Sequence, residues 1–259
     1  MRFALSVPPF TDPNAVLALT RDADANGWDA VFLWDHLRWG PDDLDIHDAW
    51  VLLGAIASRT SRVRIGTMIT PLARRRPWVV AKHLTTLDHL SGGRVTLGVG
   101  LGEPPDRDFA DLGDDPSPTV RGARLDEGLA ILGGLLGDGH VSFHGTHYDV
   151  EAGMRPLPVQ RPRIPIWVGG KAPHKRPLER ARRWDGFIPT HDDFLTPEQL
   201  AAYVGPHPRD DWDLVAEWPD DTSPDDYAAV GATWLMRSTW PHHQGWLAEL
   251  QKLASTPPA

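Results

Sequence analysis

The sequence predicts an α/β protein that folds as one (β/α)8 barrel of the TIM type. Short apolar segments alternate with segments of helical spacing, eight strand-like segments can be counted, and 259 residues are typical of one such barrel. The apolar segments are continuous rather than alternating, as expected for strands buried on both faces. An open, doubly wound sheet with fewer strands is the alternative. We therefore expect a single domain over residues 1–259.

The first half of the chain contains four strand–helix units. In the first predicted helix, Ala15, Leu19 and Ala23 share one face, and Gly27 stops the helix. The predicted strands, each with its following helix, are Arg2–Val7 with Asp12–Asn26, Ala30–Trp34 with His47–Ser58, Val63–Ile69 with Pro77–Leu90, and Val95–Val99 with Arg121–Leu136.

The second half is less regular and contains four more predicted strands. Before them, residues 138–163 read as a β-hairpin that turns at Gly145 and returns through several prolines. We expect this excursion to stand outside the barrel without forming a second domain. The predicted strands are Ile164–Val168, Asp185–Pro189, Leu214–Trp218 and Ala232–Met236, and the predicted helices are Pro177–Arg183, Pro224–Val230 and Pro241–Leu253.

The composition argues against several classes of function. The formal net charge of −9 disfavours nucleic acid and anionic membranes as partners. Cysteine is absent, which excludes disulfides, thiolate nucleophiles and cysteine-based metal sites. The first residues show no signal-peptide pattern, and no apolar run approaches the roughly 20 residues that span a bilayer. We therefore expect a soluble, cytoplasmic protein.

The segment 90–103 is the most informative part of the chain. A predicted helix ends, a short apolar strand follows, and a glycine-rich loop leads to Glu103. Glycines without side chains would let the backbone approach a flat or anionic ligand. The spacing G-x-G-x-G, with a loop expected to follow, does not fit a dinucleotide-binding fingerprint. The three glycines are Gly98, Gly100 and Gly102.

In a closed barrel the carboxyl ends of all strands meet at one rim. This rim would hold histidine, carboxylates, glycine backbone and cations, which suit acid–base chemistry and phosphate binding. Its predicted segments are Pro8–Phe10, Asp35–His36, Thr67–Pro71, Gly100–Glu103, Gly169–Lys171, Thr190–Asp192 and Arg237–Ser238.

An ordered series of motifs resembles the luciferase-like monooxygenase superfamily, the flavin- and deazaflavin-dependent barrel enzymes related to bacterial luciferase. The resemblance covers about residues 1–190. The matching segments are Leu33–His36, Ile65–Pro71, Arg76–Pro77, Leu87–Arg94, Leu97–Glu103, Phe143–Tyr148, Pro165–Gly170 and Asp185–Phe187, with a weaker match at Gly231–Trp234.

The resemblance implies an oxidoreductase that acts on a small organic substrate. His36 and Glu103 match the histidine and glutamate of the deazaflavin group, so the resemblance favours coenzyme F420 and hydride transfer, with these two residues positioning or protonating the substrate. Asp35 precedes the histidine and is either a third catalytic residue or a cap of its segment. An FMN-dependent monooxygenase that uses O2 is the alternative.

The resemblance also implies a cofactor site. Family members commonly carry a cis peptide bond not involving proline at the end of the third strand, in a bulge that supports the ring. Here we expect it at Thr67–Met68 or Met68–Ile69. The glycine loops and one cation would bind the ring and its phosphate. The residues implied in cofactor binding are Thr67, Met68, Ile69, Gly100, Gly102, Gly169, Gly170, Lys171 and Thr190.

Aromatic and basic residues flank these motifs. Trp34 is expected in the core, whereas Trp39 is a candidate wall of the substrate pocket. The basic run Arg74–Arg76 is expected to be a solvated loop.

Two other classes of protein remain open. The first is a metal-dependent hydrolase, for which the twelve histidines could supply ligands. No H-x-H motif ends the first strand, however, so no metal ligand is assigned. A non-catalytic flavin-binding relative is the second. The resemblance further implies a homodimer and a separate flavin or F420 reductase that supplies reduced cofactor.

Overall fold

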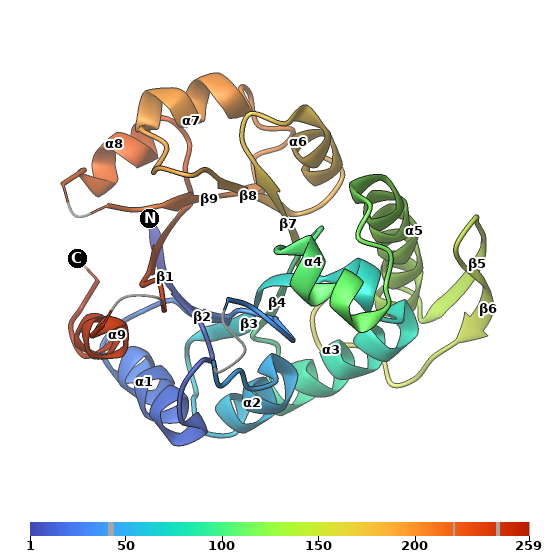
Figure 1. The fold of residues 1–259 in the computed structure, drawn as a ribbon, viewed down its shortest axis with the longest axis horizontal. Coiled ribbons are helices and arrows are strands. Elements are labelled where there is room, and N and C mark those ends of the chain that lie inside the picture. The colour runs from blue at the N-terminus through green and yellow to red at the C-terminus, as the bar shows by residue number, and fades with distance from the viewer. Residues whose placement is uncertain (41–43, 220, 242–243, 259) are drawn as a thin grey trace.

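The computed structural model describes residues 1–40, 44–219, 221–241 and 244–258. Eight parallel strands close into a barrel in the order β1-β10-β9-β8-β7-β4-β3-β2 (Figure 1). The predicted barrel is confirmed, and the open sheet is excluded. The barrel strands are β1 Arg2–Val7, β2 Ala30–Leu33, β3 Arg64–Pro71, β4 Val95–Gly100, β7 Ile166–Lys171, β8 Gly186–Thr190, β9 Asp213–Glu217 and β10 Trp234–Ser238.

Helices surround the barrel and begin at recognisable caps. Asp12 and Asp48 accept hydrogen bonds from the first turns of α1 and α2, and proline occupies the first turn of several helices. Gly92, in the left-handed conformation, ends α3. The α-helices are α1 Pro13–Ala25, α2 Ala49–Ala57, α3 Pro77–Ser91, α4 Pro105–Asp108, α5 Pro118–Leu136, α6 Lys175–Ala181, α7 Pro197–Val204, α8 Pro224–Ala229 and α9 Trp246–Ala254.

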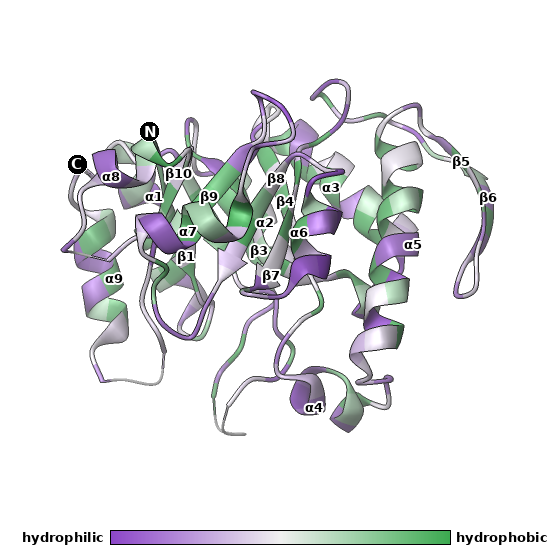
Figure 2. Cartoon of the chain, turned by 90° about the horizontal axis from the view of Figure 1, so that it is seen from above, coloured by the Kyte–Doolittle hydropathy of each residue, from purple (hydrophilic) through white to green (hydrophobic). Residues whose placement is uncertain are grey.

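Two short helices differ from the prediction. The structure contains α7 after β8, where no helix was expected, and α4 after the glycine loop, where a loop was expected. Figure 2 shows α4 beyond one end of the barrel, on the side of the carboxyl ends of the strands. The last helix is shorter at its start than expected, and residues 242–243 of that prediction lie outside the described residues.

The predicted hairpin forms a separate two-stranded sheet outside the barrel. Strand β5, His140–His144, pairs antiparallel with β6, Asp149–Gly153. Figure 1 shows both strands beyond α5, away from the barrel strands. The Glu127 carboxylate of α5 accepts hydrogen bonds from the backbone N–H groups of Thr146, His147 and Tyr148 at 2.9–3.0 Å. The hairpin is therefore anchored by its turn.

Two apolar clusters stabilise the barrel. The larger one fills the space between the strands and the helices. The smaller one fills the barrel interior, which is a packed core rather than a pore. Its buried members are Ala4, Ala30, Phe32, Met68, Trp167, Ile188, Val215, Trp234 and Met236.

Figure 2 shows the strands mostly apolar and the connecting loops mostly polar. Among the helices that the structure describes, none combines the length and the apolar character that a membrane span requires.

Candidate active site

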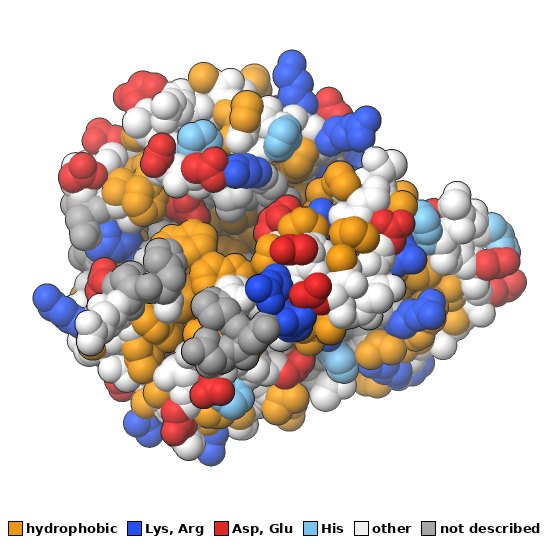
Figure 3. Space-filling view, in the orientation of Figure 1, with side chains coloured by type: hydrophobic (Ala, Val, Ile, Leu, Met, Phe, Trp, Pro, Cys, Tyr) orange, Lys and Arg blue, Asp and Glu red, His pale blue; other side chains and the backbone are white. Residues whose placement is uncertain are grey.

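The carboxyl ends of the eight strands meet at one face, which we call the mouth of the barrel. Figure 3 looks onto this face and shows a central hollow with apolar side chains around it and charged side chains at its edge. The residues considered below converge there from different strands and from the loops that follow them.

His36 follows β2 and is held by a buried carboxylate. Its Nδ1 lies 3.1 Å from Asp108 Oδ2, while Asp108 Oδ1 accepts hydrogen bonds from Leu37 N at 2.9 Å and Arg38 N at 2.8 Å. The Asp108 side chain is 0% exposed, and that of His36 is 17% exposed. Within the described part of the chain, nothing forms a hydrogen bond with His36 Nε2. The aspartate thus fixes the ring and leaves Nε2 for a ligand.

The pKa of Asp108 lies below its ordinary value. Burial raises the pKa, but the His36 hydrogen bond and the charge of Arg74 lower it by more. The guanidinium of Arg74 lies 2.5 Å from the same carboxylate oxygen. Asp108 is therefore an anion that orients the His36 ring.

Asp35 precedes His36 and is buried in a polar cluster that shares Arg74 with Asp108. Its carboxylate accepts hydrogen bonds from Arg75 Nη2 at 2.6 Å and Trp50 Nε1 at 3.0 Å, and it lies 2.8 Å from Thr70 Oγ1. Arg74 donates to the carboxylate at 3.1 Å and to the Asp35 carbonyl at 2.8 Å. Burial raises the pKa of Asp35, but the charges of Arg75 and Arg74 lower it below its ordinary value. With its side chain 2% exposed, Asp35 positions its neighbours and does not reach the mouth.

This cluster corrects the prediction for the basic run. Arg74 and Arg75 were expected in a solvated loop, yet their side chains are only 4% and 18% exposed. They neutralise the two buried carboxylates Asp35 and Asp108. Only Arg76 of this run is exposed. Buried carboxylates require such partners, because an unpaired buried charge is strongly destabilising.

Aromatic rings line the side of the mouth next to His36. Trp34 lies at 5.9 Å from Phe10, 6.1 Å from Trp39 and 5.2 Å from Trp240, measured between ring centroids. Trp34 is buried, as predicted, and its Nε1 donates to Ser6 Oγ at 2.8 Å. Trp39 is half-buried and Trp240 is 51% exposed. Together these rings form an aromatic wall that suits a flat or apolar ligand.

The predicted cis peptide bond is present at Met68–Ile69. The register between β3 and β4 shifts between Thr67 and Thr70, which marks a bulge at this bond. Met68 points into the barrel core, while Ile69 packs against that core and is half-buried. The bulge forms an apolar floor for the mouth.

Two of the predicted cofactor-binding glycines make room for this bulge. A Cβ atom at Gly100 would lie 2.8 Å from Ile69 Cδ1, and one at Gly169 would lie 2.9 Å from Ile69 Cγ2. Ile69 is therefore clamped between β4 and β7. Glycine at both positions leaves the space that the Ile69 side chain occupies.

The loop after β4 is held from below by Arg121. Its Nη1 donates to Gly102 O at 2.5 Å and to Leu101 O at 3.2 Å. Gly102 has a φ of +86°, which favours glycine. Glu103 follows as an exposed carboxylate. Its negative charge interacts electrostatically with the guanidinium of Arg121. Glu103 lies two residues before α4 and Asp108 is the last residue of α4, so one short segment carries both.

The opposite side of the mouth carries the predicted phosphate-binding residues. Lys171, the last residue of β7, forms an ion pair with Asp192 at 2.6 Å. Thr190 is its register partner on β8 and is half-buried. A Cβ atom at Gly170 would lie 2.1 Å from Pro177 Cβ, so glycine lets α6 approach the strand.

The structure adds three residues that the sequence reasoning missed: Asp108, Arg74 and Glu217. Asp108 is 72 residues from His36 in the chain. The available signal in the sequence was a carboxylate at the end of a short helical turn that begins with proline. Glu217 ends β9, and its position at the end of a buried strand was the available signal.

Outside the mouth, a groove of about 690 Å³ runs between α6 and α7. Its exposed lining is mostly apolar, and it does not contain the His36–Asp108 pair, so we place the active site at the mouth. In the residues the structure describes, no three His, Asp or Glu side chains gather into a metal-binding group.

Comparison with known proteins finds a matching family and several similar curated proteins. Residues 1–212 match the family described as luciferase-like monooxygenase. An F420-dependent glucose-6-phosphate dehydrogenase of Microbacterium testaceum is 34% identical over 232 residues, which cover 85% of this chain and 68% of that protein. The chain spans only 53% and 52% of two further curated relatives with that name, from Beutenbergia cavernae and Nakamurella multipartita.

Solved structures share the fold. The F420-dependent tetrahydromethanopterin reductase of Methanopyrus kandleri superimposes with a TM-score of 0.74 at 16% identity, covering 99% of this chain and 98% of that one. An F420-dependent secondary alcohol dehydrogenase with a bound F420–acetone adduct gives 0.69 at 25% identity, covering 83% and 68%. Because the family match extends over 212 of 259 residues and the closed barrel agrees with it, the chain belongs to the luciferase-like monooxygenase family.

Proposed function

We propose that the protein is an F420-dependent oxidoreductase that transfers hydride to or from a small organic substrate. The observation that carries this proposal is the His36–Asp108 pair, which leaves Nε2 available at the mouth beside an apolar floor. The names of the relatives support the choice of cofactor.

The residues present fit a flat redox cofactor. The half-buried Ile69 at the bulge offers an apolar support for a ring, and the aromatic wall offers a second surface. Thr67, at the bulge of β3, and Gly102, in the loop after β4, shape this site, and Lys171 with Thr190 would bind the phosphate. A bound deazaflavin would supply a ring carbon that accepts or donates hydride.

His36 provides the proton transfer that must accompany hydride transfer. When an alcohol is oxidised, its C–H bond gives up hydride and its O–H bond gives up a proton, which His36 Nε2 accepts as a general base. Asp108 stabilises the resulting imidazolium, because it is a buried anion 3.1 Å from Nδ1. In the reverse direction, His36 returns the proton to a carbonyl oxygen. Glu103, exposed in the loop after β4, is the second proposed acid–base residue.

The experiment that tests the proposal compares binding of F420 and FMN to the same preparation, by quenching of ligand fluorescence. We expect tighter binding of F420. Tighter binding of FMN together with O2-dependent turnover would favour the monooxygenase instead. Binding without turnover on alcohols, enones and imines would favour a non-catalytic relative.

The role of His36 is tested by substitution. We expect His36→Ala and Glu103→Gln to lower kcat by about a hundredfold or more while leaving the Kd for F420 within about threefold, since proton transfer rather than cofactor contact is lost. His144→Ala is the matched control, because His144 is also paired with an aspartate, Asp149, at 2.7 Å but on the exposed hairpin. Wild-type rates in both site variants would contradict the assignment.

The proposal extends to assembly and location through the resemblance to the family. Under this proposal, the protein is a cytoplasmic homodimer and receives reduced cofactor from a separate reductase. Sedimentation velocity tests the dimer, and turnover with and without an added reductase tests the supply of cofactor.

A further inference from the structure

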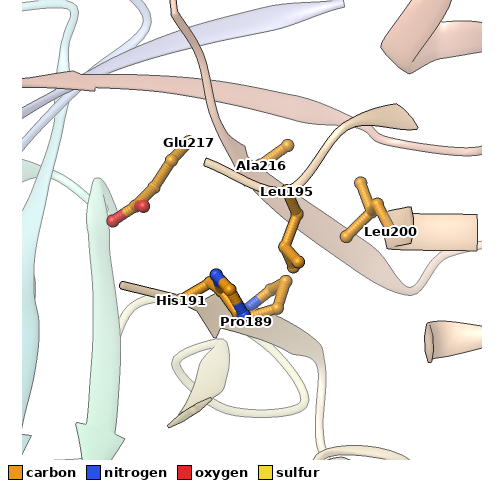
Figure 4. Close-up of a pocket in the computed structure, with 6 residues that line it drawn as sticks. All are labelled: Pro189, His191, Leu195, Leu200, Ala216 and Glu217. Atoms are coloured by element: carbon orange, nitrogen blue, oxygen red, sulfur yellow. The ribbon is translucent and has the colours of Figure 1, made fainter. Parts of the chain in front are cut away.

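Glu217 is a carboxyl group at the mouth that the proposed reaction does not use. It is the last residue of β9. Side chains alternate along a strand, and Val215 belongs to the barrel interior while Ala216 belongs to the outer core. Glu217 therefore points inward, one layer above Val215. Figure 4 shows its carboxylate directed away from Leu195 and Leu200.

The surroundings of Glu217 offer it no polar partner. The residues described by the structure form neither an ion pair nor a hydrogen bond with its carboxylate. Its side chain borders a cavity of about 10 Å³, which has room for about one water molecule. The other residues around this cavity are Pro189, His191, Leu195, Leu200 and Ala216.

The charged and titratable groups on the neighbouring elements are engaged elsewhere. After β8, His191 Nδ1 lies 3.1 Å from both N and O of Asp193. On β10, the Arg237 guanidinium lies over the Trp218 ring and donates to Trp218 O at 3.2 Å. On α8, Tyr227 donates its hydroxyl proton to Leu195 O at 2.8 Å.

Other groups of the mouth are likewise paired. Lys171 is bound to Asp192, and the hydroxyl of Ser238 on β10 donates to Ser6 O at 2.9 Å. Burial with no compensating charge therefore raises the pKa of Glu217 to about 7. A substantial fraction of the carboxyl is neutral near neutral pH and carries one O–H donor.

We propose that the Glu217 carboxyl donates a hydrogen bond to a carbonyl oxygen of the ligand bound in the mouth. The inference rests on the proposed function for the location of that ligand. A donor of this kind suits an uncharged carbonyl, whether on the cofactor ring or on the substrate. A cation would instead be held by the ionised carboxylate.

The protonation of Glu217 is tested without any ligand. Infrared difference spectra between Glu217→Gln and the wild-type protein should show the carbonyl band of one protonated carboxylic acid, which disappears as the pH rises through about 7. Glu151→Gln, in the exposed strand β6, is the control and should show no such band. Absence of the band in the Glu217 difference spectrum at about pH 6 would overturn the inference.

The contact is tested by ligand binding at about pH 6 and about pH 8.5, on either side of the Glu217 transition. Wild-type affinity should fall at the higher pH, because an ionised carboxylate can only accept hydrogen bonds and repels a carbonyl oxygen. Glu217→Gln keeps an N–H donor, so it should lose this dependence. Glu217→Ala should bind about tenfold more weakly than wild type at the lower pH.

The two sources of the carbonyl are separated by where the effect occurs. A change in the Kd for F420 without substrate assigns the contact to the cofactor, and a change confined to KM assigns it to the substrate. If the wild-type protein binds neither F420 nor FMN, the proposed function fails. If it binds and reacts, and both variants keep the wild-type pH dependence, the inference about Glu217 fails alone.

Discussion

Asp35 shows how a single residue beside the proposed catalytic histidine, His36, acts through packing and charge. Its carboxylate binds Arg74, Arg75 and Trp50 and lies next to Thr70 in a buried cluster. It thereby holds Arg74 against Asp108, and Asp108 holds His36. The position of the His36 ring therefore depends on a chain of buried charges.

We predict that Asp35→Ala lowers the free energy of unfolding by about 3–5 kcal/mol, because it leaves buried cations without their partner. Urea unfolding monitored by tryptophan fluorescence measures the change. Since the pKa of Asp35 is lowered, its stabilisation is present above the ordinary value of 3.8 and is lost as the pH falls below it. Asp149→Ala, which removes an exposed pair, is the control and should change stability by less than about 1 kcal/mol.

Glu217 has the opposite effect on stability. Its pKa rises from 4.5 to about 7 on folding, so the folded state binds more protons between these values. Stability should decrease as the pH rises from about 4.5 to about 7 and level off above, by up to about 3 kcal/mol. Glu217→Gln should remove this decrease. Urea unfolding at a series of pH values measures it, and parallel curves for the two proteins would contradict the assignment.

The sequence indicated His36 and the cis peptide bond but not the partners that hold the histidine. Asp108 could not be identified because its contact with His36 spans 72 residues of chain. The burial of Arg74 could not be predicted either, since a run of three arginines normally indicates a solvent-exposed segment. Residue type and spacing identify groups with chemistry, whereas the pairing of buried charges is a property of the folded chain.

At the scale of elements, the close approach of β3 and β4 shapes the floor of the mouth. A Cβ atom at Gly66 would lie 1.7 Å from Thr96 O, and one at Gly98 would lie 2.3 Å from Thr67 O. The two strands pack backbone to backbone below the bulge, and neither can shift without disturbing Met68 and Ile69.

We predict opposite effects for two glycine-to-alanine changes. Gly66→Ala should lower the free energy of unfolding by about 3 kcal/mol or more, because the new methyl group meets backbone that cannot move aside. Gly54→Ala, on α2 with nothing within 4 Å of the new Cβ, should raise it by about 0.5–1 kcal/mol through helix propensity. Thermal unfolding of both variants measures the changes. Equal effects would contradict the packing between β3 and β4.

Most elements could be predicted because their apolar runs and punctuating residues are local signals. The exceptions are α4, which is a single turn, and α7, which is short and lies in a polar stretch. For α7, the available signal was its capping box, in which Thr196 and Gln199 exchange hydrogen bonds around Pro197. The end of β3 could be anticipated only from the resemblance, since no local pattern encodes the bulge.

At the scale of the whole molecule, the two ends of the chain close the barrel. β1 pairs with β10, and α9 packs beside α1. Trp28 Nε1 lies 3.2 Å from Leu253 O and 3.0 Å from Thr256 O, linking the start of β2 to the last turns of α9. The closing elements are therefore part of the main core.

We predict that Leu250→Ala lowers the free energy of unfolding by about 2–5 kcal/mol, because this side chain of α9 is completely buried. Leu90→Ala is the control, since Leu90 is 57% exposed, and should change stability by less than about 1 kcal/mol. Calorimetry on both variants measures the difference. A small effect at Leu250 would show that α9 contributes little to the core.

The eight-strand count and the barrel were predictable at this scale because the alternation of elements is global and regular. The mouth was predictable as a place, since parallel strands bring their carboxyl ends to one face. Which side chains meet there was not, because contacts such as Ser6 with Trp34 depend on strand register.

The pairing of β1 with β10 also matters while the protein is being made. The ribosome synthesises β1 long before β10, so the N–H and C=O groups of Arg2 and its neighbours have no partner on β10 until Trp234 and its neighbours have been made. An unpaired strand edge on a growing chain invites association with other nascent polypeptides. We therefore expect that translation stalled before residue 232 leaves a chain that requires a chaperone, whereas synthesis through β10 ends that requirement.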